Sequence, residues 1–447
     1  MSWKRMTLQG WGRTARAETL ASRPERQREV ASLLAAPEAE PGLIAYGGGR
    51  SYGDAALNSG GATLLTQRLN RLLDFSPDTG LLVCEAGATF QDFLRTFLPR
   101  GYVAPVSPGT AFVTVGGAIA HDVHGKNHDH NGSFGDHLAW IELLLPDGRT
   151  LRASRDEEPE LFAATIGGLG LTGVILRAAF RLQKAPSSHV VVRERRLPDL
   201  QSFMAAFAEI RRQATYSVGW IDGAARGVQL GRGILQTAEY ATGAVPPASR
   251  ARERRMPVDL PGIALNRHSV RLFNEAYFRQ VPAAGRDRVL PLEKFLYPLD
   301  AILDWNRLYG RRGFYQLQCV LPDATAERGL PALMERIAEA GAASFLAVLK
   351  TLGRRGHGYL SFPMPGFTLA LDLPARPGTP ALMADLEATI LDHGGRTYLA
   401  KDACLSPAGF RRMYPDLPRL QEVLGRVDPS GRMRSDMARR LQIHGAA

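Results

Sequence analysis

The chain has 447 residues, more than one simple hydrophobic core normally holds, so two domains are expected. Hydrophobic residues make up 45% and charged residues 22%, as in an ordinary globular protein, and no apolar run is long enough to cross a bilayer. The basic N-terminus lacks the apolar core of a secretory signal. The widely spaced Cys84, Cys319 and Cys404 exclude a disulfide scaffold, so a reducing, cytoplasmic location is expected.

The formal net charge of +11 allows two interpretations. It indicates either an anionic partner or a compositional preference for arginine. The spread of arginines along the whole chain suits the second interpretation. No basic block carries interleaved aromatic residues, so a nucleic-acid partner is not expected. Lysine is rare: the chain has only Lys4, Lys126, Lys184, Lys294, Lys350 and Lys401. Each lysine is therefore somewhat more apt to serve as a point charge or a proton-transfer group.

In chain order, the pattern predicts a helix over 20–40 and then short apolar strands separated by glycine turns. A hairpin over 137–154 turns at Asp147-Gly148. From about residue 185 the pattern changes to longer strands and amphipathic helices. The helices are predicted over 199–213, 326–341 and 380–393, and two clear strands over 315–322 and 366–374. A segment rich in Pro, Arg and Ala, 241–264, predicts a long mobile surface loop.

Two glycine-rich loops indicate a phosphate-containing ligand. GGGRSYGD at 47–54 and SPGTAFVTVGGAIAHDVHGKNH at 107–128 free the backbone of side chains, so that N–H groups from both loops can converge on a diphosphate. A formal GxGxxG at Gly168, Gly170 and Gly173 lies instead between a predicted helix and a predicted strand. A dinucleotide fingerprint needs the reverse order, so a tight turn is favoured there.

Histidines at 121, 124, 128 and 130 have spacings that could suit a metal. No HExxH pattern accompanies them, and Gly125 argues against a continuous helix across the cluster. The sequence therefore favours no metal site and a polar lining for a cofactor ring.

Read together, these loops, the run HGKNHDHNGSFG and the late YLAKD resemble the vanillyl-alcohol oxidase type of FAD-binding fold, also called the PCMH type. The closer resemblance is to the decaprenylphosphoryl-β-D-ribose 2′-oxidase family, and it runs nearly end to end, through WNRLYG, LSFPMPG and SDMARRL. The resemblance implies an α+β, two-domain protein with an antiparallel substrate-domain sheet flanked by helices. The expected boundaries are 6–185 for the FAD domain, 186–395 for the substrate domain and 396–447 for a segment that returns to the FAD domain.

By matching position, the resemblance implies FAD contacts from both glycine loops and from two later residues. These are Ala45, Tyr46, Gly47, Gly48, Gly49, Arg50, Ser51, Tyr52, Gly53, Asp54, Ala55, Gly109, Thr114, Val115, Gly116, Gly117, His121, His124, Gly125, Ile175 and Tyr398. Many relatives carry a histidine at the position of Arg50 and bond it to the flavin. Arginine cannot form that bond, so noncovalent FAD is expected.

The resemblance also implies a substrate and a reaction. The C2′ hydroxyl of a polyprenylphosphoryl pentose would be oxidised to a ketone, and a separate NADH-dependent short-chain reductase would complete epimerisation to the arabinose form for the cell envelope. Lys401 is the first candidate for the base, with His124 and Tyr52 as alternatives. Substrate contacts are expected from Lys126, Tyr297, Gln316, Gln318, Lys350, Thr368, Ala370 and Lys401. Ala370 occupies a position where mycobacterial relatives have a cysteine that covalent inhibitors capture.

Two other functions compete with this reading. An aldonolactone or other sugar-alcohol oxidase of the same flavin fold would act on a short water-soluble sugar. From another class, a non-catalytic lipid-sugar binding protein would keep the fold without flavin. The basic 241–264 segment favours a lipid phosphate at a peripheral membrane surface, on the cytoplasmic side.

Overall fold

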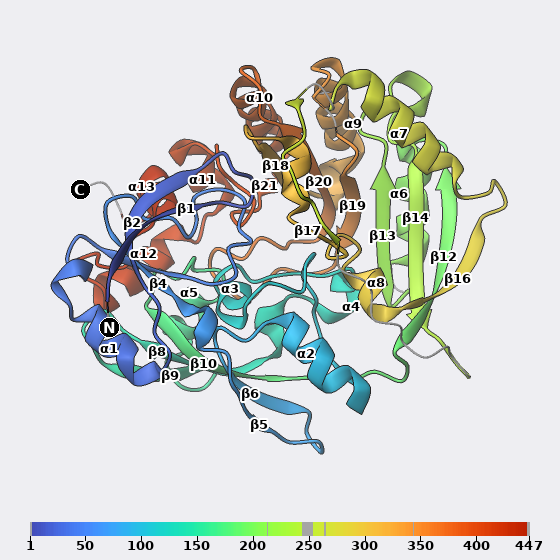
Figure 1. Ribbon diagram of the computed structural model, residues 1–447. Helices are drawn as coiled ribbons and strands as arrows, with labels where there is room; N and C mark the ends of the chain where they lie inside the picture. Colours follow the sequence, from blue (N-terminus) through green and yellow to red (C-terminus); the bar gives the residue numbers. More distant parts are fainter. Residues whose placement is uncertain (1, 212, 244–253, 263–264, 343, 445–447) are drawn as a thin grey trace.

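The computed structural model describes residues 2–211, 213–243, 254–262, 265–342 and 344–444. The N-terminal part of the chain builds two sheets, which lie in the left and lower parts of Figure 1. The four-stranded sheet has the order β1 (Lys4–Gln9), β2 (Arg16–Ser22), β4 (Ala62–Leu65), β3 (Leu43–Tyr46). The five-stranded sheet has the order β5 (Leu72–Phe75), β6 (Leu81–Glu85), β10 (Val174–Arg181), β8 (Leu138–Leu144), β9 (Thr150–Ser154).

The helix predicted over 20–40 is largely wrong. Residues up to Ser22 belong to β2, which pairs antiparallel with β1 and parallel with β4. Alternate side chains of β2 are buried, and this period of two overrides the helical propensity of its Ala and Glu residues. Only α1 (Gln27–Leu34) is α-helical, between Pro24 and a short 3₁₀ turn over Pro37–Ala39.

The second large unit is an eight-stranded sheet in which every neighbouring pair is antiparallel. Its order is β16 (Arg286–Pro291), β12 (His189–Leu197), β14 (Gly233–Tyr240), β13 (Tyr216–Ile221), β19 (Ala347–Leu352), β20 (Gly366–Pro374), β18 (Phe314–Pro322), β21 (Arg396–Thr397). The helices α6 (Leu200–Ile210), α9 (Asp323–Glu339) and α10 (Thr379–Asp392) cover one face (Figure 1). This α+β arrangement confirms the predicted fold class and the predicted helices and strands of this unit.

The remaining helices and short strands connect and cover the sheets. The helices are α2 (Phe90–Phe97), α3 (Val115–Ala120), α4 (His128–Asn131), α5 (Pro159–Thr165), α7 (Arg267–Arg279), α8 (Leu292–Leu296), α11 (Pro407–Met413), α12 (Leu417–Val427) and α13 (Asp436–Arg440). The short strands are β7 (Tyr102–Val103) with β11 (Gln183–Lys184), and β15 (Arg254–Arg255) with β17 (Ile302–Leu303). Short 3₁₀ turns cover Thr66–Arg68, Leu98–Arg100, Phe134–His137, Gly227–Gln229 and Trp305–Tyr309.

The C-terminal segment contacts both units. Its first residues add β21 to the eight-stranded sheet, whereas α12 packs on α5 and Met433 forms a bridge with Leu43 beside the four-stranded sheet. Arg440 in α13 donates to the carboxylates of Asp54 and Asp402 at 2.8 and 2.9 Å. The exact domain boundaries stay a prediction, but the tail reaches the N-terminal sheets as the resemblance implies.

The segment 241–264 is only partly described, since residues 244–253 and 263–264 lie outside the described residues. The described stretch 254–262 is mostly irregular and lies at the surface, as predicted, but contacts with other segments fix part of it. It contains β15, and Asp259 accepts hydrogen bonds from Arg13 at 2.7 Å and from Arg307 at 3.1 Å. Among the described residues, no helix has the length and hydropathy to cross a membrane.

Candidate active site

A cavity of about 1010 Å³ lies between the N-terminal sheets and the uncovered face of the eight-stranded sheet. Its lining comes from segments far apart in the chain: both glycine loops, strands β13, β18, β19 and β20, and the YLAKD segment. This volume is at the upper end of the range for small-molecule and cofactor pockets. The cavity therefore joins the predicted cofactor and substrate residues in one site.

The two glycine loops pack against one another so closely that side chains would not fit. A Cβ atom on Gly47 would lie 2.3 Å from the hydroxyl oxygen of Thr114, and one on Gly48 would lie 2.3 Å from the carbonyl oxygen of Phe112. Gly49 has a φ of +65°, which favours glycine. The carbonyl oxygen of Gly47 accepts from Gln67 at 2.6 Å, which fixes the loop from behind. The loops thus form a cradle of backbone along one wall of the cavity.

Three buried polar atoms on cavity residues have no hydrogen-bond partner among the described residues: Nε of Arg50, Nε2 of His121 and Nδ1 of His124. Such atoms are costly unless a ligand satisfies them. The guanidinium of Arg50 lies over the rings of Trp11 and Phe112, 4.2 and 4.8 Å from their centroids. The cradle and these unsatisfied donors and acceptors fit a large, flat, polar cofactor such as FAD.

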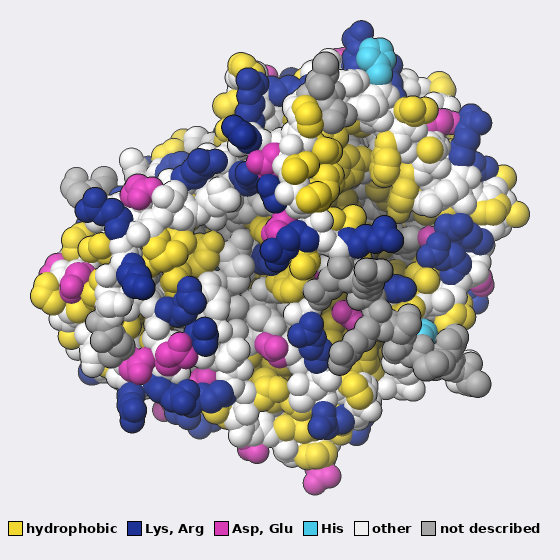
Figure 2. All heavy atoms as spheres, viewed as in Figure 1, with side chains coloured by type: hydrophobic (Ala, Val, Ile, Leu, Met, Phe, Trp, Pro, Cys, Tyr) yellow, Lys and Arg dark blue, Asp and Glu magenta, His cyan; other side chains and the backbone are white. Residues whose placement is uncertain are grey.

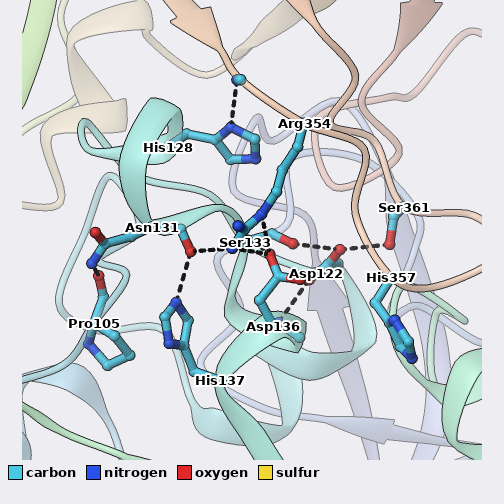
Figure 3. Close-up of polar contacts among 12 residues, drawn as sticks. Pro105, Asp122, His128, Asn131, Ser133, Asp136, His137, Arg354, His357 and Ser361 are labelled. Carbon is cyan, nitrogen blue, oxygen red and sulfur yellow. Dashed lines mark hydrogen bonds and ion pairs between the residues drawn. The ribbon is translucent and has the colours of Figure 1, made fainter. Parts of the chain in front are cut away.

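The four histidines of the cluster separate into two groups. His121 and His124 line the cavity, but His128 and His130 do not, and His130 is exposed. The Nδ1 of His128 accepts from the backbone N–H of Gly353 at 3.0 Å (Figure 3). No group of His, Cys, Asp and Glu side chains in the described part of the chain could hold a metal ion. Two of the four histidines therefore lie where a cofactor ring could contact them, and the ring lining stays a prediction.

The histidine segment is held by the buried Asp122, whose φ of +41° is unusual for a residue with a side chain. Its carboxylate accepts from Ser133 at 2.9 Å, from Ser361 at 2.5 Å and from the backbone of Gly135 at 2.9 Å (Figure 3). Burial raises the pKa of Asp122 to about 6 even with these bonds. Asp122 thus connects the cofactor side of the cavity to the segment before β20 and fixes where His121 and His124 lie.

The substrate-side wall follows from the period of two along the central strands. Gln316 and Gln318 of β18, Val348 and Lys350 of β19, and Ala370 of β20 all face the cavity. The register places Gln318 opposite Ala370 and Lys350 opposite Thr368. The Nε2 of Gln318 donates to the Nε2 of His124 at 2.9 Å, which links the two walls. His124 is then a neutral ring with its proton on Nδ1, pointing a donor at the cavity.

Lys401 reaches the cavity from the C-terminal segment. The backbone N–H of Tyr52 donates to the carbonyl of Ala400, and that of Tyr398 to the carbonyl of Gln318, so this segment is tied to both walls. The ammonium of Lys401 lies 3.7 Å from the centroid of the Tyr52 ring. Burial, opposed by the nearby Asp372 carboxylate and aided by Lys350, lowers the pKa of Lys401 to about 7. A proton-accepting amine is therefore available near neutral pH.

Two further lysines carry charge in the same cavity. Burial lowers the pKa of Lys126 to about 7, with a contribution from Lys350, and burial lowers the pKa of Lys350 to about 8. The ammonium of Lys126 donates to the carbonyl of Phe295. Neither lysine forms an ion pair with a carboxylate among the described residues. Unneutralised cations in an enclosed cavity favour an anionic ligand.

Not every predicted contact lines the cavity. Asp54 pairs with Arg440 instead, because the carboxylate is turned toward the C-terminal helix. Val115 is buried in the core at the start of α3, Tyr297 is buried behind Ser107, and Thr368 lies behind Gln318 at 3.5 Å. These four residues support the walls rather than form them. Ala370 does line the cavity, and the neighbouring thiol of Cys319 is buried on the covered face of the sheet, so neither offers a reactive thiol there.

Sequence reasoning missed Asp372, which lies two residues beyond Ala370 on the same face of β20. The side chain is fully buried and accepts from Tyr309 at 2.9 Å and from Gln316 at 2.5 Å. Burial raises the pKa of Asp372 to about 7. An acidic residue at an inward position of the apolar run FTLALDLP was the signal available in the sequence.

Comparisons with known proteins agree with this geometry. Residues 19–154 match the family model described as an FAD binding domain, and residues 372–441 match the model for D-arabinono-1,4-lactone oxidase. The chain is 35% identical, over 98% of its length and 97% of the relative, to decaprenylphosphoryl-beta-D-ribose oxidase of Mycolicibacterium smegmatis. The chain belongs to the decaprenylphosphoryl-β-D-ribose oxidase family. This membership and the matched domain make it an FAD-dependent oxidoreductase.

More distant relatives match about a third of this chain. Cytokinin dehydrogenase 2 of Arabidopsis thaliana is 32% identical over 32% of this chain and 28% of its own length. A putative D-arabinono-1,4-lactone oxidase of Neurospora crassa is 27% identical over 35% of this chain and 28% of its own length.

The Lys401–Asp372 pair makes a pH prediction. If the free amine of Lys401 accepts the substrate proton, kcat/KM rises with pH through the pKa of Lys401. The Asp372 charge raises that pKa, so Asp372→Asn should lower it and move the rising limb to lower pH. Stopped-flow flavin reduction at several substrate concentrations across pH 5–9 gives kcat/KM at each pH. The pH at which kcat/KM rises reports the pKa of the base in the free enzyme. A limb that stays in place or moves upward contradicts the assignment.

Proposed function

We propose that this enzyme oxidises the C2′ hydroxyl of a polyprenylphosphoryl-β-D-ribose to the 2′-keto sugar, the first half of epimerisation to an arabinose donor for the cell envelope. Bound FAD supplies the hydride acceptor. The observation that carries the proposal is the presence of the cofactor cradle and of Lys126, Lys350 and Lys401 in one cavity. A neutral sugar would leave the protonated forms of Lys126 and Lys350 without a counter-charge, whereas a phosphodiester supplies one.

The residues then take distinct roles. Lys401 in its free-amine form accepts the C2′ hydroxyl proton, and Lys350 and Lys126 bind the phosphate oxygens. His124 points its Nδ1–H at the hydroxyl and stays neutral, because burial and the positive charge of Lys350 lower its pKa well below the usual value. Tyr52 keeps its proton, because burial raises its pKa, and its ring positions the amine of Lys401. Gln318 holds the imidazole of His124 in the required tautomer.

The direct test is anaerobic mixing of the purified holoenzyme with a polyprenylphosphoryl ribose while the flavin absorbance is followed. Bleaching at a saturable rate, with formation of the 2′-keto sugar by mass spectrometry, is the expected result. Bleaching by aldonolactones and not by the phosphoryl ribose would contradict this substrate and favour the activity of a lactone oxidase. The D-arabinono-1,4-lactone oxidase model matches residues 372–441. A colourless protein without flavin would favour the lipid-sugar binding alternative.

We also propose that the FAD is noncovalent, since Arg50 lines the cavity at the position where the resemblance places a flavin-bonding histidine in many relatives, and arginine cannot form that bond. Acid precipitation of the holoenzyme should therefore release all of the yellow colour into the supernatant. The measurement is flavin absorbance in pellet and supernatant after precipitation. Colour or flavin fluorescence retained on the denatured band in a gel would contradict the prediction.

Two further parts of the function are proposed on the same basis. A separate NADH-dependent short-chain reductase consumes the keto product, because the product is only half epimerised. The enzyme works peripherally at the cytoplasmic membrane surface, where a polyprenyl substrate resides. Cosedimentation with anionic lipid vesicles, compared with neutral vesicles, tests the membrane part, and the basic charge of the chain supports the preference for anionic lipid.

A further inference from the structure

The cavity opens beside α7 onto a group of apolar side chains that solvent reaches. Phe273 of α7 is 47% exposed and Ile302 of β17 is 39% exposed, and both line the cavity. In Figure 2, hydrophobic side chains gather between α7 and β18, and Lys and Arg side chains lie directly below them in this view. Exposed apolar groups that continue into a cavity indicate a binding surface rather than chance exposure.

Polar contacts help to hold α7 in place. The amide of Asn274 donates to Asp222 at 2.7 Å, and Arg232 bridges Asp222 and Glu275 at 2.8 and 2.7 Å. Val270 is the apolar residue of α7 that is buried. The helix therefore keeps its position while Phe273 and Tyr277 remain available on the cavity side.

A continuous series of aromatic contacts leads from Phe273 into the site. The ring centroids of Phe273 and Phe345 lie 5.6 Å apart, and those of Phe345 and Tyr309 lie 5.8 Å apart. Further in, the centroid distance is 4.2 Å from Tyr309 to Phe314 and 5.5 Å from Phe314 to Tyr52. The series ends at the ring under Lys401.

On the outer side, Phe273 stacks on Tyr277 at 5.9 Å, and Tyr277 contacts Trp220 at 4.7 Å. Phe273, Phe345, Tyr277 and Trp220 line the cavity itself. One end of the cavity is thus cationic and the other is aromatic and open.

We propose that this aromatic groove, formed by Trp220, Phe273, Tyr277, Ile302 and Phe345, binds the polyprenyl chain of the substrate. The inference rests on the proposed function and adds the site of the lipid tail. An amphiphile with an anionic head and a long apolar tail matches a cavity with lysines at its inner end and aromatic rings at its mouth. A free sugar phosphate would use the inner end alone.

The test compares two substrates that share the phosphoryl-ribose head, one with a farnesyl and one with a decaprenyl chain. The quantity measured is the ratio of KM for the short chain to KM for the long chain, from flavin reduction by the full-length holoenzyme. The wild type should prefer the long chain. Phe273→Ser should lower the ratio by about tenfold, the size expected for losing one buried aromatic contact. Phe273→Leu, which keeps an apolar side chain, should restore most of the preference.

Leu272 supplies the matched control. It is the next residue on α7 and is 74% exposed, but it does not line the cavity. Leu272→Ser should leave the ratio at the wild-type value. If the KM ratio fell equally in Leu272→Ser and Phe273→Ser, α7 would contact a lipid surface instead. That result would contradict the proposal that the groove binds the polyprenyl chain. A ratio unchanged in Phe273→Ser, or a wild type without chain-length preference, would overturn it too.

A second measurement separates this inference from the proposed function. Sugar-free decaprenyl phosphate should bind the wild type more tightly than farnesyl phosphate, and Phe273→Ser should remove the difference. If neither ribose substrate reduces the flavin of the wild type, the proposed function fails, and the binding comparison still decides whether the groove takes a polyprenyl chain. Equal affinity of the wild type for both lipid phosphates would overturn the groove alone.

Discussion

Lys401→Ala should retain FAD and lose substrate-driven flavin reduction by about 10²- to 10⁴-fold, the usual contribution of a positioned proton acceptor. The physical reason is the position of the amine, which is enclosed beside the Tyr52 ring with its pKa lowered to about 7. Alanine removes the acceptor and leaves the backbone bonds of the YLAKD segment in place. The flavin absorbance spectrum measures cofactor retention, and stopped-flow mixing measures the reduction rate.

Lys294→Ala is the matched control for this variant, because Lys294 is an exposed lysine on α8 that does not line the cavity. It should reduce at the wild-type rate. Lys401→Arg is informative as well, since arginine keeps the positive charge but does not accept a proton at neutral pH. A normal rate in Lys401→Arg would show that only the charge matters and would remove Lys401 as the base.

Local sequence signals located the cofactor side of the site well. The strings around Gly47–Gly49 and Gly116–Gly117 are each contiguous, and a Cβ atom on Gly47 or Gly48 would clash with the facing loop, so the residues that line this part of the cavity are neighbours in the sequence. The antiparallel substrate sheet also followed from the alternation along β18 and β20.

Features that depend on long-range packing were not predictable from local pattern. Asp54 looks like part of the glycine loop, but its carboxylate pairs with Arg440, which is 386 residues further along the chain. His128 and His130 share a short string with His121 and His124, and yet the turn through Asp122 directs only the latter two to the cavity. The predicted helix over 20–40 failed because strand pairing of β2 with β1 and β4 outweighs helix propensity.

Lys350→Met should weaken the binding of phosphorylated ligands by about 10- to 100-fold, which corresponds to the loss of one charge-assisted hydrogen bond. Lys350 stands at the centre of the cationic wall, since its charge lowers the pKa of Lys126, of His124 and of Lys401. Methionine is one atom shorter but keeps an unbranched apolar stem, so β19 should pack as before. The measurement is the KM of polyprenylphosphoryl ribose together with the Kd of the sugar-free polyprenyl phosphate.

Lys350→Met should also shift the pH dependence of kcat/KM, in the direction opposite to the shift expected for Asp372→Asn. Because the Lys350 charge lowers the pKa of Lys401, its removal should raise that pKa and move the rising limb of kcat/KM to higher pH. A purely structural role for Lys350 would raise KM without moving the limb, and a limb that moves the same way in both variants would contradict the electrostatic account. Opposite shifts in the two variants, with phosphate affinity lost only in Lys350→Met, would assign Lys401 as the titrating base and Lys350 as the residue that binds the phosphate.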